Sequence, residues 1–343
     1  HTDLMAMAAG NQYLILDAPR REFYGGGDWN DAFNWTGSRN PDSNDDAFVR
    51  DSQGPGTVIT ASLSASDSVQ NLFVSEGANV DLNSFQLTAV QDVFVSDLDS
   101  DIFINPGGEL AADEVFIQNQ AEIEMNGGTV DVRRLVIDAT SQLEGVSGGA
   151  MTIDVSQGLV NDGVIDVDND AVMTFQTTGG AVWDLDGVIG DGQLFANDGD
   201  LIFDTGSLSD AFGGTITVGP GHFLRFDASW TIQGGGVVNL DGGSGAGQAG
   251  GDGLTDGVSD FGAPVTFTNG TVNVGADDTL NFLNVTTINN GTFTVAQDGS
   301  LNFNATTTVS GGTFNTFSTS TADGDVEFNG FTWWEDTVTI NGV

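Results

Sequence analysis

The fold is decided by residues 269–314, which read NGTVNVGADDTLNFLNVTTINNGTFTVAQDGSLNFNATTTVSGGTF. Within this stretch Asn269-Gly270-Thr271-Val272 returns as Asn290-Gly291-Thr292-Phe293 and then as Gly311-Gly312-Thr313-Phe314, each time after 21 residues. Leu280-Asn281-Phe282 returns as Leu301-Asn302-Phe303 at the same spacing. A fixed period of this length is typical of a solenoid, in which each repeat is one coil that buries its apolar side chains against its neighbours.

The same period extends toward the N-terminus in a less regular form. Short runs of β-branched and aromatic residues recur at steps of 21, 22 and 20 residues: Leu72-Phe73-Val74, Val93-Phe94-Val95, Val115-Phe116-Ile117 and Leu135-Val136-Ile137. Such runs are typical of strands, and no segment has the periodicity of an amphipathic helix. We therefore predict an all-β protein, a parallel β-helix (β-solenoid) with coils of about 21 residues.

Stacked coils should bring like side chains together in ladders. One aromatic ladder is expected inside the solenoid from Phe73, Phe94 and Phe116, and another from Phe282 and Phe303. The turn residues Asn83, Asn105 and Asn126 are expected at one corner, where their amides bond to each other and to the backbone.

The sequence divides into four parts. Residues 1–45 do not repeat and are predicted to cap one end, and residues 46–240 carry the irregular coils. Residues 241–260 form a Gly-rich, acidic loop, and residues 261–343 carry the most regular coils and the C-terminal end.

The charge balance is extreme, with 49 acidic residues against 7 basic ones and a formal net charge of −42. Nucleic acid and insertion into a membrane are not expected, because anionic partners reward cationic patches and no apolar run approaches the ~18 residues of a membrane span. The acidic surface favours solubility in a salty medium, with cation binding as the alternative. There is no Cys, and the chain begins at His1 with only a short apolar segment from Leu4 to Ala9, so we expect a mature extracellular or cell-surface protein.

Two runs place Asp at alternate positions. They contain Asp97, Asp99 and Asp101, and Asp166, Asp168 and Asp170. On a strand such residues share a face, and in a loop their oxygens would wrap a hard cation such as Ca²⁺. Neither run has the Gly and Glu of an EF-hand loop, so calcium sites and solvated acidic turns both stay open.

Catalytic chemistry has little support in the sequence. Two His and no Cys argue against a zinc site. A polysaccharide-cleaving site would need paired carboxylates beside cationic side chains. The pair Arg133-Arg134 is expected instead to form surface ion pairs with Asp131 and Glu124. We therefore do not expect an enzyme.

Four Trp residues lie in the two terminal regions: Trp29, Trp35, Trp333 and Trp334. A β-solenoid ends in open strand edges, and natural solenoids need caps there. The Trp pairs either cap their own ends or leave an end free to accept the opposite end of another copy. A head-to-tail contact that does not close generates filaments.

The opening motif resembles a known family. Gly26-Gly27-Asp28-Trp29-Asn30, Asn34-Trp35-Thr36-Gly37, Pro41 and Asp45-Asp46-Ala47 are similar to the leader of large secreted bacterial β-solenoids. The Gly-Thr-Val and Gly-Thr-Phe steps resemble the strand repeats of autotransporter passengers. This resemblance implies a secreted or surface protein with a structural and adhesive role and without catalytic residues.

Two functions follow as expectations. The first is an extracellular structural protein that uses itself as partner and assembles through its solenoid ends into a filament, sheet or surface layer. The second is a monomeric adhesin or carbohydrate-binding passenger domain that binds surface glycans through the loop 241–260.

Overall fold

The structure is a computed structural model of the chain. It describes residues 4–6, 13–15, 18–51, 58–147, 149–177, 181–185, 192–196, 198–204, 207–208, 212–219, 222–227, 230–233, 236–240, 258–275, 278–296, 299–316, 318–319, 322–323, 325–328, 332–334 and 338–342. For residues 4–6, 13–15, 207–208, 230, 233, 240 and those from 318 on, it describes the backbone alone.

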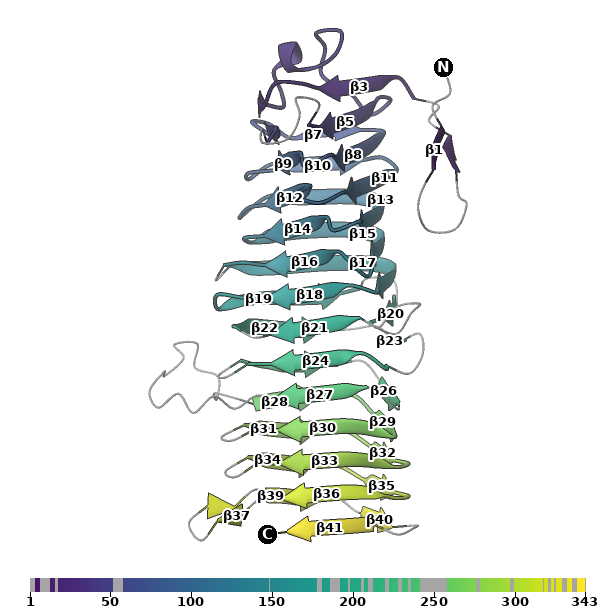
Figure 1. Cartoon of the computed structure of the whole chain (residues 1–343), viewed down its shortest axis with the longest axis vertical. Coiled ribbons are helices and arrows are strands. Elements are labelled where there is room, and N and C mark those ends of the chain that lie inside the picture. Colours follow the sequence, from purple (N-terminus) through teal and green to yellow (C-terminus); the bar gives the residue numbers. More distant parts are fainter. Residues whose placement is uncertain are drawn as a thin grey trace.

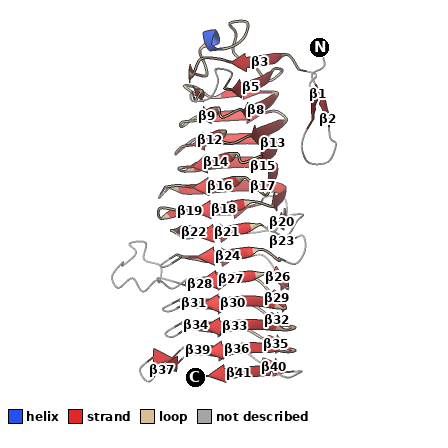
Figure 2. Ribbon diagram, viewed as in Figure 1, coloured by secondary structure: helices blue, strands red, loops and turns tan. Residues whose placement is uncertain are grey.

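The coils stack along one axis into an elongated parallel β-solenoid, as Figure 1 shows. Successive coils are about 22 residues apart, close to the predicted 21. Strands dominate the described residues, which contain no α-helix and a single short 3₁₀ helix, η1 (Ala32–Asn34), at the N-terminal end (Figure 2). The predicted fold class is confirmed.

Three parallel sheets form the walls. Sheet 1 has 18 strands: β3 (Arg20–Phe23), β5 (Asp46–Arg50), β7 (Asp67–Val69), β8 (Asn71–Ser75), β10 (Gln86–Ala89), β11 (Asp92–Ser96), β13 (Glu109–Gln118), β15 (Gly128–Ile137), β17 (Ala150–Asn161), β19 (Ala171–Gln176), β20 (Val182–Asp184), β22 (Gly199–Phe203), β23 (Ser207–Leu208), β25 (Leu224–Phe226), β28 (Val258–Phe261), β31 (Thr279–Phe282), β34 (Ser300–Phe303) and β39 (Asp325–Phe328). Sheet 2 has 14 strands: β4 (Gly27–Asp28), β6 (Thr60–Ser62), β9 (Asn79–Asp81), β12 (Asp101–Ile104), β14 (Glu122–Met125), β16 (Gln142–Gly145), β18 (Val164–Val167), β21 (Gln193–Ala196), β24 (Thr215–Val218), β27 (Val237–Leu240), β30 (Gly270–Val274), β33 (Gly291–Val295), β36 (Gly312–Thr316) and β41 (Val338–Gly342). Sheet 3 has five strands: β26 (Trp230–Gln233), β29 (Val265–Thr268), β32 (Thr286–Ile288), β35 (Thr307–Val309) and β40 (Thr332–Trp334).

Two antiparallel pairs lie outside these sheets: β1 (Leu4–Ala6) with β2 (Tyr13–Ile15), and β37 (Ser318–Thr319) with β38 (Ala322–Asp323). Within sheet 1 the long strand β13 pairs with β10 through its first part and with β11 through its second part. Sheet 1 therefore bends around a corner and supplies two sides of each of these coils. In the regular coils sheet 3 takes the place of the second side.

The sequence repeat gives the strand register. Leu72 pairs with Val93, Val93 with Val115 and Val115 with Leu135, as their spacing predicts. In the regular coils Leu280 pairs with Leu301. These side chains are fully buried in one continuous core that follows the axis. The three turn Asn residues also meet at one corner. There Asn126 Nδ2 donates to Asn105 Oδ1 at 3.4 Å, and Asn83 Nδ2 donates to the carbonyl of Leu63 at 2.8 Å.

The ladder of Phe282 and Phe303 lies inside, as predicted. Their ring centroids are 5.0 Å apart, and neither side chain is more than 1% exposed. The ladder continues through four further stacked rings of earlier coils, those of Phe175, Phe203, Phe226 and Phe261.

The ladder of Phe73, Phe94 and Phe116 differs from the prediction. Leu72 and Val74 point into the main core, so Phe73 between them points outward. The three rings stack with Phe48 in a separate cluster on the outer side of sheet 1, where the Arg20 guanidinium lies 4.3 Å from the Phe48 ring. A run of three consecutive apolar residues does not indicate which face is internal, and the prediction chose the wrong face.

The domain boundaries predicted from the sequence fall on recognisable features. Strand β3 pairs with β5, and β4 pairs with β6, so the first 45 residues supply strands of the solenoid as well as a cap. Residues 241–257 of the predicted loop lie outside the described residues. Its remaining residues, 258–260, belong to β28, which pairs with β25. The same sheet therefore continues across the insertion.

Candidate functional site

The N-terminal cap is built around two Trp side chains. Trp29 and Trp35 are both 0% exposed, and their rings meet edge to face with centroids 4.6 Å apart. The Trp35 Nε1–H donates to the carbonyl of Trp29 at 2.7 Å, and the Trp29 Nε1–H donates to Asp67 Oδ2 at 2.8 Å. The chain thus buries both rings against its own first coils, and a contact with another copy at this end would use the outer surface of the cap.

The other two Trp residues lie in the last strand of sheet 3. In β40, Trp333 pairs with Thr308 and Trp334 pairs with Val309 of β35. Their side chains lie outside the described residues. The assembly role predicted for Trp333 and Trp334 stays a prediction.

Acidic side chains form two adjacent columns on the outer face of sheet 2. Asp101 pairs with Glu122 in one column. In the next column Glu124 pairs with Glu144, and Glu144 with Asp166. Neighbours in a column lie one interstrand distance apart, about 4.8 Å. We call these five residues the carboxylate ladder.

Burial and mutual repulsion disfavour ionisation of the ladder. Partial burial and the charges of Asp99 and Glu124 raise the pKa of Asp101 to about 6. Burial and the charges of Asp168 and Glu144 raise the pKa of Asp166 to about 6. The pKa of Glu122 is raised strongly by burial and by a hydrogen bond and charge repulsion from Glu144, which means that these two carboxyls share a proton.

The structure separates the six Asp residues predicted to bind calcium. Asp97 and Asp99 occupy a turn with positive φ, whereas Asp101 begins β12. Asp166 belongs to the ladder, and Asp168 and Asp170 lie in the turn that follows β18. Neither run places its three carboxylates on one strand face, and calcium binding at these positions stays a prediction.

One of the six, Asp170, joins a different group. Among the described residues, the ligand atoms of Asp170, Asp198 and His222 lie within 4.8 Å of one another, a group that could hold a metal ion. The three residues come from successive coils and lie just before β19, β22 and β25. Sequence analysis missed this group because its members are 28 and 24 residues apart and share no local motif.

His222 lies between two carboxylates. Its Nε2 is 3.4 Å from Asp198 Oδ1, and its Nδ1 is 3.4 Å from Asp200 Oδ1. Asp200 is buried and also accepts a hydrogen bond from the backbone N–H of Phe223 at 3.1 Å. The hydrogen bond from Asp200 raises the pKa of His222 above its ordinary value.

The basic pair Arg133-Arg134 is part of a surface ion-pair cluster. Arg133 binds Asp113 and Glu114, and Arg134 Nη1 lies 3.7 Å from Glu114 Oε2. The predicted partners, Asp131 and Glu124, were wrong, because stacking places Arg134 directly beside Glu114 of the preceding coil. These contacts give a structural reason for the pair.

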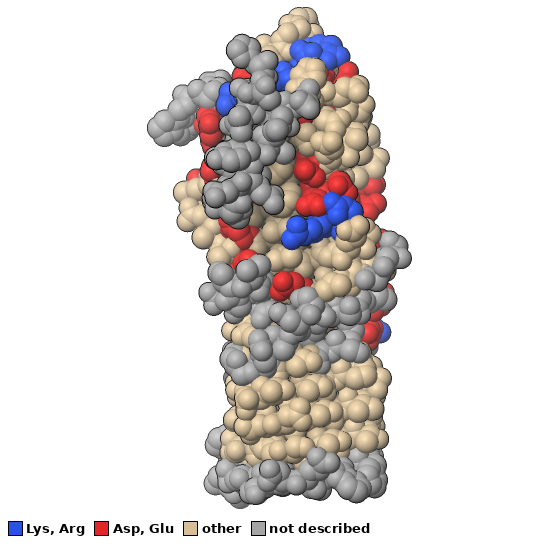
Figure 3. Space-filling model, turned by 90° about the vertical axis from the view of Figure 1, so that its right-hand side faces the viewer, with Lys and Arg blue, Asp and Glu red and all other residues tan. Residues whose placement is uncertain are grey.

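The regular coils between residues 261 and 316 have a different surface. Their charged residues are Asp277, Asp278 and Asp298. The outer positions of sheet 2 instead carry columns of Thr and Asn, which are Thr271, Thr292 and Thr313 in one column and Asn273, Thr294 and Asn315 in the other. Sheet 3 carries a column of Thr266, Thr287 and Thr308. Figure 3 shows this contrast on the side where sheet 3 lies: charged groups gather over earlier coils, and the described atoms of the regular coils are uncharged.

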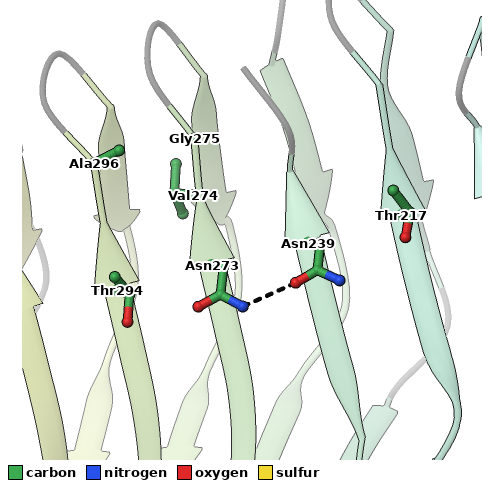
Figure 4. A pocket seen from close by; sticks show the side chains of 7 residues that line it. All are labelled: Thr217, Asn239, Asn273, Val274, Gly275, Thr294 and Ala296. Atoms are coloured by element: carbon green, nitrogen blue, oxygen red, sulfur yellow. Dashed lines mark hydrogen bonds between the residues drawn. The ribbon is translucent and has the colours of Figure 1, made fainter. Parts of the chain in front are cut away.

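A shallow hollow lies where this uncharged surface begins on sheet 2. It has a volume of about 400 Å³ and is lined by Thr217, Asn239, Asn273, Val274, Gly275, Thr294 and Ala296. Figure 4 shows the polar side chains in a row across neighbouring strands, with Asn273 Nδ2 donating to Asn239 Oδ1 at 2.8 Å. The row offers hydroxyl and amide groups at a regular spacing, without a charged group among its lining residues.

Comparison of the chain with profiles of protein families, with curated proteins and with solved structures found no match. No helix in the described part of the chain is long and apolar enough to cross a membrane.

Proposed function

We propose that this chain is an extracellular, rod-shaped adhesin that attaches to a neutral, hydroxyl-rich polysaccharide through sheet 2 of its regular coils. The observation that carries the proposal is the uncharged Thr and Asn surface of residues 261–316 in a chain with a net charge of −42. A secreted location and an adhesive role are also what the resemblance to autotransporter passengers implies.

The chemistry of the surface selects the class of partner. A strongly anionic protein repels anionic polymers, so the partner that this surface fits is neutral. Single hydrogen bonds contribute only about 0.5–1.5 kcal/mol each, so binding requires many of them at once. A polymer with repeated hydroxyls can bond to side chains that repeat along the sheet, and bonds such as Asn273–Asn239 hold those side chains in place.

The test is sedimentation of the protein with insoluble neutral polysaccharides, compared with anionic ones. Wild-type protein should sediment with at least one neutral polymer. The double variant Asn273→Asp/Thr294→Glu should lose this binding, because it places two charges in the row. The control variant Thr266→Asp/Thr287→Glu adds the same charge to sheet 3 and should still bind. Equal binding by wild type and the sheet 2 variant would contradict the proposal.

A second candidate function is assembly of copies into a filament, sheet or surface layer. The strands β39, β40 and β41 pair on one side with β34, β35 and β36. No other strand in the described part of the chain pairs with their second side. An unpaired strand edge can accept another strand. Because each copy carries a charge of −42, assembly should require salt or divalent cations.

Negative-stain electron microscopy tests this second candidate. Regular filaments or sheets in seawater-level salt with calcium, which dissolve in low salt with chelator, are the expected result. Thr339→Lys in β41 should prevent them, because a charge on an edge strand opposes pairing. Thr292→Lys, in the same column but within the solenoid, is the control. Isolated rods under all conditions would contradict assembly.

A further inference from the structure

We propose that Asp170, Asp198 and His222 form a binding site for a divalent transition-metal ion of the Zn²⁺ class. The ion would link three successive coils at one corner of the solenoid. This site is independent of the proposed adhesion, since its residues lie at a corner of sheet 1 and the uncharged row lies on sheet 2.

The geometry of the ligand atoms fits such an ion. Ligands about 2.1 Å from a tetrahedral ion lie about 3.4 Å from one another. His222 Nε2 and Asp198 Oδ1 are 3.4 Å apart, and Asp170 brings the third ligand atom within 4.8 Å. Asp170 and Asp198 are also joined through their backbones, with the Asp170 N–H donating to the Asp198 carbonyl at 2.5 Å. Three protein ligands leave a fourth position for water.

The buried carboxylate of Asp200 provides a second, independent reason. Metal-binding His residues usually donate their other ring N–H to a carboxylate, which fixes the tautomer and the ring orientation. Asp200 is 8% exposed and its Oδ1 lies 3.4 Å from His222 Nδ1, while the Phe223 N–H holds the same oxygen. With Nδ1 directed at Asp200, Nε2 faces Asp198. This arrangement distinguishes the site from the carboxylate ladder, which has no nitrogen ligand and no such support.

The ligand set also selects the class of ion. Calcium binds six to eight oxygen atoms. Imidazole nitrogen together with carboxylates suits Zn²⁺, Co²⁺, Ni²⁺ and Cu²⁺. We therefore assign the site to a transition ion, although the small number of His and the absence of Cys argued against zinc at the level of sequence.

Co²⁺ is the probe that tests the site, because its visible absorption reports nitrogen and oxygen ligation. The full chain is freed of metal with chelator and titrated with Co²⁺ in the presence of excess Mg²⁺ and salt, which suppress weak binding to the acidic surface. The expected result is one tight ion per chain with a visible absorption band, displaced by Zn²⁺ and not by an equal concentration of Ca²⁺.

Variants assign the ion to these residues. His222→Gln and the exposed Asp198→Asn should each weaken Co²⁺ binding at least tenfold, and Zn²⁺ should raise the melting temperature of wild type but not of either variant. His1→Gln, which removes the other His, and Asp99→Asn, which removes an exposed Asp elsewhere, should bind like wild type. Wild-type binding by both site variants, the absence of a tight ion in wild type, or displacement by Ca²⁺ would each overturn the proposal.

Discussion

At the scale of single residues, the parallel stacking of coils decides how charges interact. In a parallel solenoid the same position of consecutive coils forms a column, so one acidic residue per coil becomes a row of like charges about 4.8 Å apart. Like charges directly opposite each other on neighbouring strands are destabilising. The chain keeps such a row between Asp101 and Asp166, and the raised pKa values of its members show that the fold opposes their ionisation.

Removing one ladder charge should stabilise the protein in a pH-dependent way. The pKa of Glu122 is raised in the folded state, so the folded chain holds a proton that the unfolded chain releases above about pH 4.3. Stability therefore falls as the pH rises from there toward the raised pKa. Glu122→Gln should raise the urea midpoint at about pH 8 by the equivalent of about 1 kcal/mol and have little effect at about pH 4.

Urea unfolding at the two pH values checks this expectation. Glu76→Gln removes the same formal charge from an exposed turn outside the ladder and serves as the control. An equal effect of both substitutions would mean that the net charge, rather than the ladder, is responsible.

The sequence revealed the ladder residues only in part. Alternating Asp residues attracted attention to Asp101 and Asp166, but Glu122, Glu124 and Glu144 join them only through strand register. His222 looked like an isolated turn residue for the same reason. An alignment of the repeats through their insertions would have placed Asp170, Asp198 and His222 in consecutive coils, because the strands that follow them pair in register.

At the scale of elements, the sequence predicted what repeats and missed what depends on direction. Coil length, strand pairs, the corner of Asn residues and the inner ladder of Phe282 and Phe303 all follow from the period. The face on which Phe116 lies does not, because both faces of that strand carry apolar residues. Register supplies the missing information: the column of Phe116 continues through Val136 and Val160 to Asp184, and a carboxylate marks the outer face.

Polar substitutions should distinguish the two Phe ladders. Phe116→Thr, on the outer side of sheet 1, should cost about 1 kcal/mol, because the ring is only half-buried there. Phe282→Thr should cost about 3–5 kcal/mol, because it leaves a cavity and a hydroxyl in the core. Chemical denaturation of both variants measures the difference, and similar losses would contradict the assignment of the two faces.

The N-terminal cap should open when its central ring is removed. Trp35→Ala deletes a fully buried ring that contacts Phe23 and Trp29, at a cost of about 3–5 kcal/mol. In a solenoid each coil depends on its neighbours, so the damage should remain near the cap. Limited proteolysis should cut first within residues 18–45, whereas Phe33→Ala, which alters a ring that is 77% exposed, should be cut like wild type. Resistance of the Trp35 variant would show that the cap does not depend on this ring.

At the scale of the whole molecule, the net charge of −42 opposes a compact rod, and salt should relieve this opposition. Charges on distant coils are screened at ~0.1 M salt, where the Debye length is about 10 Å. Neighbours in the carboxylate ladder, about 4.8 Å apart, are screened only when the Debye length falls to about 3 Å at ~1 M. The melting temperature should therefore keep rising between these two concentrations. In the triple variant Glu122→Gln/Glu144→Gln/Asp166→Asn the rise over this range should be smaller, because the closest repelling pairs are gone. Thermal unfolding of both proteins across the salt series measures the effect, and identical salt dependence would show that the ladder contributes no more than the average surface charge.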